Sequence, residues 1–159
     1  MRNKRRFIIW SIITVVIMLI IFFMSAQPAD DSQEQSDLVL WLLHKIGMAE
    51  NITDSGEAFF LFVSIRKIAH MAIFFALAFS MNIAIYNVRH FTNSTTETIT
   101  LIGSYIYAAL DELHQTFVPG RAGMITDTMI DLIGIVIAIL ILTIYRMIKN
   151  NNRAHVEEL

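Results

Sequence analysis

Residues 7–24 form an unbroken run of eighteen uncharged and mostly apolar residues, FIIWSIITVVIMLIIFFM, which limits the architectures open to this chain. A run of this length can cross the hydrocarbon layer of a membrane as one helix. The basic sequence MRNKRR precedes it, as in a signal peptide, but the apolar part of a signal peptide has about 7–15 residues and ends at small residues. This run ends in Phe-Phe-Met, so we expect an uncleaved membrane anchor.

The composition agrees with a membrane protein. Of 159 residues, 55% are hydrophobic and only 16% are charged, whereas soluble domains carry about 25% charged residues. The net charge of −2 gives no reason to expect a nucleic-acid partner. The chain has no cysteine, which excludes disulfide scaffolds, thiolate metal sites and cysteine nucleophiles.

Three more apolar stretches follow, and two of them are short for a membrane. Residues 68–86 are long enough to span, but only thirteen uncharged residues separate Glu97 from Asp111, or about 20 Å of helix. Fourteen uncharged residues follow Asp131. The hydrocarbon layer is about 30 Å thick, so both helices can cross it only if they carry these carboxylates inside.

We therefore predict an all-α fold, an integral membrane four-helix bundle. The expected spans are about 7–24, 66–86, 98–118 and 125–146. They form one transmembrane domain over 7–148, between a basic N-terminus (1–6) and a polar tail (149–159). Eight of the twelve Lys and Arg residues fall on the side of the two termini, which predicts a multi-pass cell-membrane protein with both termini in the cytoplasm.

The segment between the first two spans contains a short amphipathic helix by its pattern. In DLVLWLLHKIG, Leu38, Trp41, Leu42 and Lys45 recur at helical spacing, and Gly47 ends the pattern. This helix either lies on the outer membrane face or packs on the bundle as a lid. Further along, the spacing of Asp54 and Glu57 predicts a helix start that extends the second span outward.

Depth along each predicted helix brings polar side chains to one shallow band near the outer surface. The band contains Arg66, Lys67, His70, Asp111, Glu112, His114, Gln115, Asp127 and Asp131, with Arg121 in the loop above it. The pairs 66/70, 111/115 and 127/131 each share a helix face, while Lys67 and Glu112 are turned away and either line the edge or pair with each other. Charged groups in lipid are costly, so these side chains should face a shared pocket.

Taken singly, several of these residues have structural explanations. Arg66 and Lys67 are typical interfacial anchors, His70 a packing residue and Asp127 a helix cap, while Arg121 suits a turn. The remaining polar residue of interest, Gln27, suits a loop. Nine polar side chains in one band of so apolar a chain nevertheless favour a functional site.

These residues carry a resemblance to a known family. RKIAH at 66–70, DELHQTFVPGR at 111–121 and DTMID at 127–131 with Gly134 are similar to the VanZ-like family of bacterial membrane proteins, and Ser25-Ala-Gln27 is similar to its S-x-Q signature. Met71 stands where an aromatic residue is expected. The resemblance implies an integral membrane protein of a Gram-positive bacterium, and the family's namesake is associated with low-level teicoplanin resistance; it implies no mechanism.

Three hypotheses for the site remain open. As an enzyme acting on an envelope lipid or lipid-linked cell-wall precursor, it would use His70, Asp111, Glu112 and His114 in catalysis. Substrate binding would fall to Gln27, Arg66, Lys67, Gln115, Arg121, Asp127 and Asp131, with the cations holding phosphate. The alternatives are a non-catalytic protein that binds a lipid or a lipophilic antibiotic or assists another protein, and a proton or ion relay.

A divalent metal is a further option, since Asp111 and His114 have a spacing compatible with ligands on one helix. The expected partners are membrane lipids and a lipid-linked or lipophilic ligand. The sequence leaves the oligomeric state open.

Overall fold

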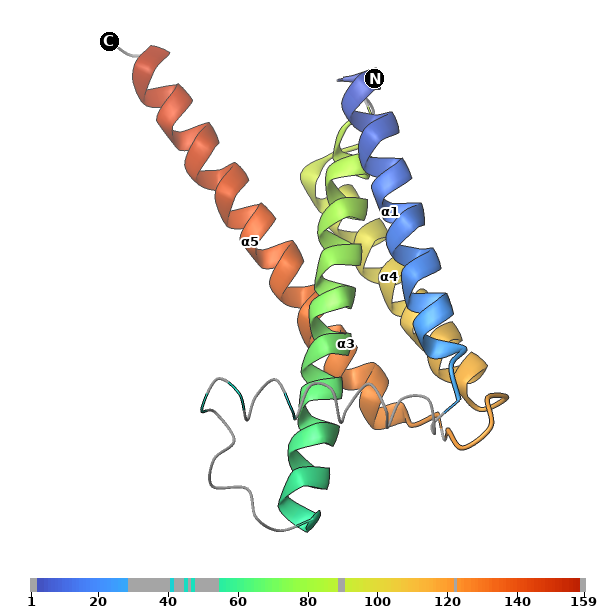
Figure 1. The fold of residues 1–159 in the computed structure, drawn as a ribbon. Helices are drawn as coiled ribbons and strands as arrows, with labels where there is room; N and C mark the ends of the chain where they lie inside the picture. Colours follow the sequence, from blue (N-terminus) through green and yellow to red (C-terminus); the bar gives the residue numbers. More distant parts are fainter. Residues whose placement is uncertain are drawn as a thin grey trace.

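The chain folds as an all-helical bundle. A computed structural model describes residues 3–28, 41, 45, 47, 55–88, 91–121 and 123–157. Its helices are α1 (Lys4–Ser25), α3 (Ser55–Tyr86), α4 (Asn93–Gln115) and α5 (Ile125–Glu157), and no strand occurs in these ranges. Consecutive helices run in opposite directions, so the start of α1 and the end of α5 lie at the same end of the bundle (Figure 1). The predicted four-helix bundle is confirmed.

Helix bounds differ from the expected spans in ways that local residues explain. α3 begins at Ser55, so the predicted earlier start of the second helix is confirmed. α4 begins at Asn93 because the Thr92 side chain accepts a hydrogen bond from the Thr95 amide, and it ends at Gln115, before the expected 118. α5 continues to Glu157, through most of the segment expected to be a polar tail.

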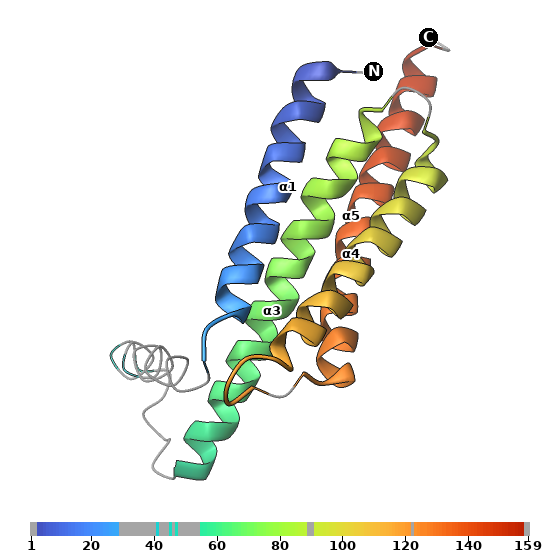
Figure 2. The same cartoon turned by 90° about the vertical axis from the view of Figure 1, so that its right-hand side faces the viewer.

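The hydrophobic core lies in the middle of the bundle, around α3, which packs against the other three helices (Figure 2). It consists of Ile21, Phe74, Leu77, Ala78, Ala108, Ile135 and Ala138. Gly134 brings α5 against the backbone of α3, since a Cβ atom there would lie 2.2 Å from the Met71 carbonyl oxygen. Any larger residue at this position forces the two helices apart.

α4 is inside-out compared with a helix of a water-soluble protein. Its polar residues Thr96, Thr100 and Ser104 are fully buried, whereas Ile106 and Leu110 are more than half exposed. Apolar side chains on the outside and polar ones inside suit a helix surrounded by lipid. Three helical segments are long and apolar enough to cross a membrane, Lys4–Ser25, Arg66–Tyr86 and Ile125–Asn152, and α4 is less apolar than these.

Only part of the predicted amphipathic helix falls within the described residues. Trp41 and Lys45 are helical, and the Lys45 ammonium lies 4.8 Å from the centroid of the Trp41 ring. Gly47 has a φ of 75°, a left-handed conformation that suits its expected role as a helix stop. The other residues of this segment lie outside the described ranges, so the choice between membrane surface and lid stays open.

Candidate functional site

A small polar cavity lies between α3, α4 and α5, at the end of the bundle where the α4–α5 turn lies; we call this the site end. The cavity measures about 20 Å³, room for one water molecule or a group of that size. Its lining residues are Arg66, Lys67, His70, Glu112, Gln115, Asp127, Ile130 and Asp131. The structure thus brings together seven of the eleven residues that the sequence proposed for the site.

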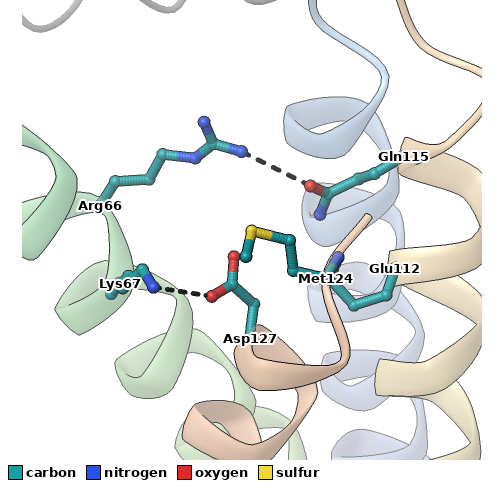
Figure 3. Close-up of polar contacts among 6 residues, drawn as sticks. All are labelled: Arg66, Lys67, Glu112, Gln115, Met124 and Asp127. Carbon is teal, nitrogen blue, oxygen red and sulfur yellow. Dashed lines mark hydrogen bonds and ion pairs between the residues drawn. The ribbon is translucent and has the colours of Figure 1, made fainter. Parts of the chain in front are cut away.

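Two cations from α3 lie beside the polar groups of the neighbouring helices (Figure 3). The Lys67 ammonium lies 2.9 Å from the Asp127 carboxylate, so Lys67 pairs with α5 and not with Glu112, although both residues line the cavity. Arg66 donates to the Gln115 side-chain oxygen across 3.4 Å. This distance is at the long limit for a hydrogen bond, so the guanidinium is held loosely.

Glu112 joins α4 to the start of α5. Its carboxylate accepts a hydrogen bond of 2.9 Å from the Met124 amide, and an acidic group near a helix N-terminus is stabilising (Figure 3). The loop approaches α4 closely here, since a Cβ atom on Gly123 would lie 2.2 Å from the Glu112 carbonyl oxygen. These contacts give Glu112 a structural role beside its place on the cavity wall.

Asp111 is buried and does not line the cavity, but it contacts Gln115, which does. It accepts hydrogen bonds from the Ser25 hydroxyl at 2.9 Å and from the Gln115 amide at 3.0 Å. Gln115 therefore bridges Asp111 and Arg66, while Ser25 ties the end of α1 to α4. In the sequence, Ser25 stands out only as part of the S-x-Q signature; its fully buried position makes it the partner that Asp111 needs.

Asp131 differs from the other acids of the site. Its side chain is 0% exposed, and neither carboxylate oxygen has a hydrogen-bond partner within the described ranges. Burying a polar group without such a partner is costly, and an exception of this kind needs an explanation. Since Asp131 lines the cavity beside the half-buried His70, a ligand group in the cavity would supply the missing partner.

The remaining predicted residues do not line the cavity. The His114 ring stacks on Phe22 of α1, with 4.7 Å between ring centroids and 6° between the planes. Arg121 donates to the Met24 carbonyl oxygen at 3.2 Å, which fixes the α4–α5 loop to the end of α1. Burial, followed by the charge of Arg66, lowers the pKa of Arg121 below its ordinary value. Gln27 lies just beyond α1.

A comparison with models of known protein families identifies the family of this chain. The model of the VanZ/LLP1 family matches residues 10–146. The chain belongs to the VanZ/LLP1 family. Searches of curated proteins and of solved structures gave no match. The family resemblance found in the sequence is confirmed, and with the apolar helices it makes this VanZ/LLP1 chain a membrane protein.

The described donor set of this VanZ/LLP1 protein does not suit a resident metal ion. Within the described ranges, no three His, Asp or Glu side chains are grouped so that they could hold one. Asp111 and His114, the pair whose spacing suggested ligands, contact Ser25 and Phe22 instead. The arrangement is better suited to hydrogen bonding and proton transfer by His70 and Asp131.

Proposed function

We propose that this VanZ/LLP1 protein acts on the polar headgroup of an envelope lipid or lipid-linked cell-wall precursor, at the site end and on the outer side of the membrane. The observation that carries the proposal is Asp131, fully buried without a hydrogen-bond partner, beside His70 in one cavity. A carboxyl group in this position forms a hydrogen bond with a ligand hydroxyl, and the imidazole takes up or returns the proton.

Size and charge narrow the ligand class. A cavity of about 20 Å³ admits a hydroxyl group but no larger part of a lipid, so the rest of the headgroup stays at the mouth. There Arg66 and Lys67 are within reach of a phosphate, which the arginine fork binds by two parallel hydrogen bonds. The favoured ligand is therefore a headgroup that carries both a phosphate and a free hydroxyl.

The proposed roles follow the contacts. His70 and Asp131 touch the ligand hydroxyl, and Arg66 binds the phosphate. Asp111 and Glu112 act by position, because Asp111 holds Gln115 and Glu112 holds the start of α5. His114 has a structural role, because its ring stacks on Phe22 of α1.

A proton relay across the membrane has less support from the packing. The core residues Phe74, Leu77 and Ile135 are fully buried and lie between the site and the opposite end of the bundle. Among the described residues, this core contains no acidic or histidine side chain, so we do not develop the relay further.

Lipid profiling of a deletion strain tests the proposal. The strain is complemented with the wild type, with Asp131→Asn, with His70→Ala, and with Glu97→Gln as the matched control, since the Glu97 carboxylate lies outside the cavity and binds Thr143. We expect a phosphate lipid or precursor bearing a free hydroxyl to accumulate in the deletion strain. Wild type and Glu97→Gln should remove it, and the two site variants should not.

Two results would contradict this function. If the deletion leaves all lipid classes unchanged while the purified protein retains a lipid that Asp131→Asn loses, the protein is a binder without chemistry. If site variants and control complement equally, the cavity has no role. Teicoplanin tolerance is followed in the same strains, and we expect it to fall with the site variants only.

The orientation has its own test. The chain has no cysteine, so a single one at Pro119 reports on the site end and a single one at Ser94 on the opposite end. We expect an impermeant thiol reagent to label the first variant in intact cells and not the second. The reverse pattern would put the cavity on the cytoplasmic side.

A further inference from the structure

A second polar feature lies at the opposite end of the bundle, where α1 begins and α5 ends; we call this the terminus end. A groove of about 390 Å³ opens there, within the size range of ligand pockets. Its charged and aromatic lining residues are Arg6 and Trp10 of α1, Tyr86 of α3, and Tyr145, Arg146 and Lys149 of α5. Of the described residues that line it, three are cationic and none is acidic.

The groove exists because α1 and α5 separate at this end. Their backbones do not pack against each other in the described ranges, and both views show the end of α5 apart from α1 (Figures 1 and 2). α3 lies behind the groove and contributes Ile83 to its wall, while α5 contributes Leu142. The lining thus combines apolar side chains with three cations, which suits a ligand with both an acyl chain and an anionic headgroup.

Arg146 is held in place before any ligand arrives. It is only 7% exposed, its Nη2 donates to the Asn82 side-chain oxygen, and its guanidinium carbon lies 4.0 Å from the centroid of the Tyr86 ring. Asn82 is itself fixed, because its amide donates to the Thr100 hydroxyl at 3.1 Å. A cation whose side chain is already ordered loses little conformational freedom on binding an anion.

The level of the groove along the bundle suits a headgroup. The apolar spans begin at Lys4 and end at Tyr86 and Asn152, so the rim lies where membrane and water meet. Tyrosine and tryptophan side chains are typical of that level. Glu97, which binds Thr143 on the neighbouring face of α5, is not among the lining residues.

We infer that the groove at the terminus end is a binding site for one anionic phospholipid of the adjacent leaflet. Arg6, Arg146 and Lys149 surround its phosphate, and an acyl chain runs between α1 and α5 along the apolar side chains of the groove. This inference is independent of the proposed function, because no residue of the cavity at the site end lines the groove.

Native mass spectrometry of the full-length protein in detergent tests the inference, with phosphatidylglycerol as the probe. Phosphatidylcholine, whose headgroup carries no net charge, is the second probe, and inorganic phosphate is added as a competitor. We expect phosphatidylglycerol to bind at least tenfold more tightly than phosphatidylcholine, and millimolar inorganic phosphate to leave it bound. A free phosphate site would show competition instead, and would overturn the lipid assignment.

The matched variants are Arg6→Gln and Arg5→Gln, adjacent exposed arginines of which only Arg6 lines the groove. A cation near an anionic lipid contributes about fivefold in affinity, so Arg6→Gln with Lys149→Gln should weaken binding about 25-fold. Arg5→Gln should change it less than twofold. Both residues of the double variant are exposed, so it tests the groove without replacing the buried Arg146.

Two outcomes overturn the inference. An equal loss in Arg5→Gln and Arg6→Gln means general attraction between the basic N-terminus and anionic lipid, with no site. Equal affinity for phosphatidylglycerol and phosphatidylcholine means that the groove selects no charge.

Discussion

At the site end, cations and acids from three helices surround a cavity of about 20 Å³, whereas at the terminus end three cations surround a groove of about 390 Å³. α5 lines both, with as many cavity residues as α3 and more groove residues than any other helix. Near the site it is pressed against α3 at Gly134, and toward its C-terminus it diverges from α1 (Figure 1). One helix thus borders a narrow polar site at one end and a wide groove at the other.

This difference indicates different uses. In the narrow cavity, the fully buried Asp131 would interact strongly with a group that enters, as the proposed chemistry on a headgroup requires. In the open groove, exposed Arg6 and Lys149 meet a ligand that keeps much of its contact with water and lipid. We therefore associate the site end with reaction and the terminus end with recognition of the membrane.

The largest effect is expected from Gly134→Ala, which breaks the close contact that sets the two ends apart. The new methyl group would meet the Met71 carbonyl oxygen at 2.2 Å, a backbone atom that cannot move alone. We expect the free energy of unfolding in detergent to fall by about 3 kcal/mol. Gly103→Ala is the control, because its methyl group meets only the flexible Met81 side chain, at 3.3 Å, and should cost less than about 1 kcal/mol.

A smaller effect is expected from Ser25→Ala, which removes the hydrogen bond between α1 and Asp111 of α4 at the site end. The buried Asp111 loses one of the two hydrogen-bond donors that the described residues give it, so the free energy of unfolding should fall by about 2 kcal/mol. Ser11→Ala, on the same helix and half-buried, is the control and should cost much less. Equal costs would mean that the Ser25–Asp111 bond contributes nothing specific.

The smallest effect is expected from Lys67→Gln. The Lys67–Asp127 pair is partly exposed, at 36% and 27%, so its loss should lower the free energy of unfolding by about 0.5 kcal/mol. Lys149→Gln at the terminus end is the comparison, and we expect no measurable change there, because Lys149 approaches the Tyr145 ring only to 5.8 Å. A loss above about 2 kcal/mol in Lys67→Gln would show that the site end depends on this pair for its fold.

Much of the fold followed from the sequence because apolar runs and helix geometry constrain it strongly. The fixed rise per residue placed Asp111 and Asp131 at similar depths from opposite directions, and that arithmetic brought the site helices together correctly. The pattern also gave the early start of α3 at Ser55. The axial position of a residue along a helix follows directly from its number, because the rise per residue is constant.

What the sequence could not give was the rotation of each helix against its neighbours. Helical phase alone left Lys67 free to pair with Glu112, and nothing local indicated that His114 would stack on Phe22. Arg146 was counted only as a cation on one side of the membrane. Its burial depends on Asn82 and Tyr86, which lie on another helix, 64 and 60 residues earlier in the chain.

The most direct test of the account is the free energy of unfolding of Asp131→Leu, measured together with its ability to restore the lipid profile of the deletion strain. If Asp131 is kept for function, its unpartnered carboxylate costs stability, and leucine of similar size should raise the free energy of unfolding by about 1–3 kcal/mol while restoring nothing. A variant that is less stable than the wild type, or one that restores the profile, would contradict it.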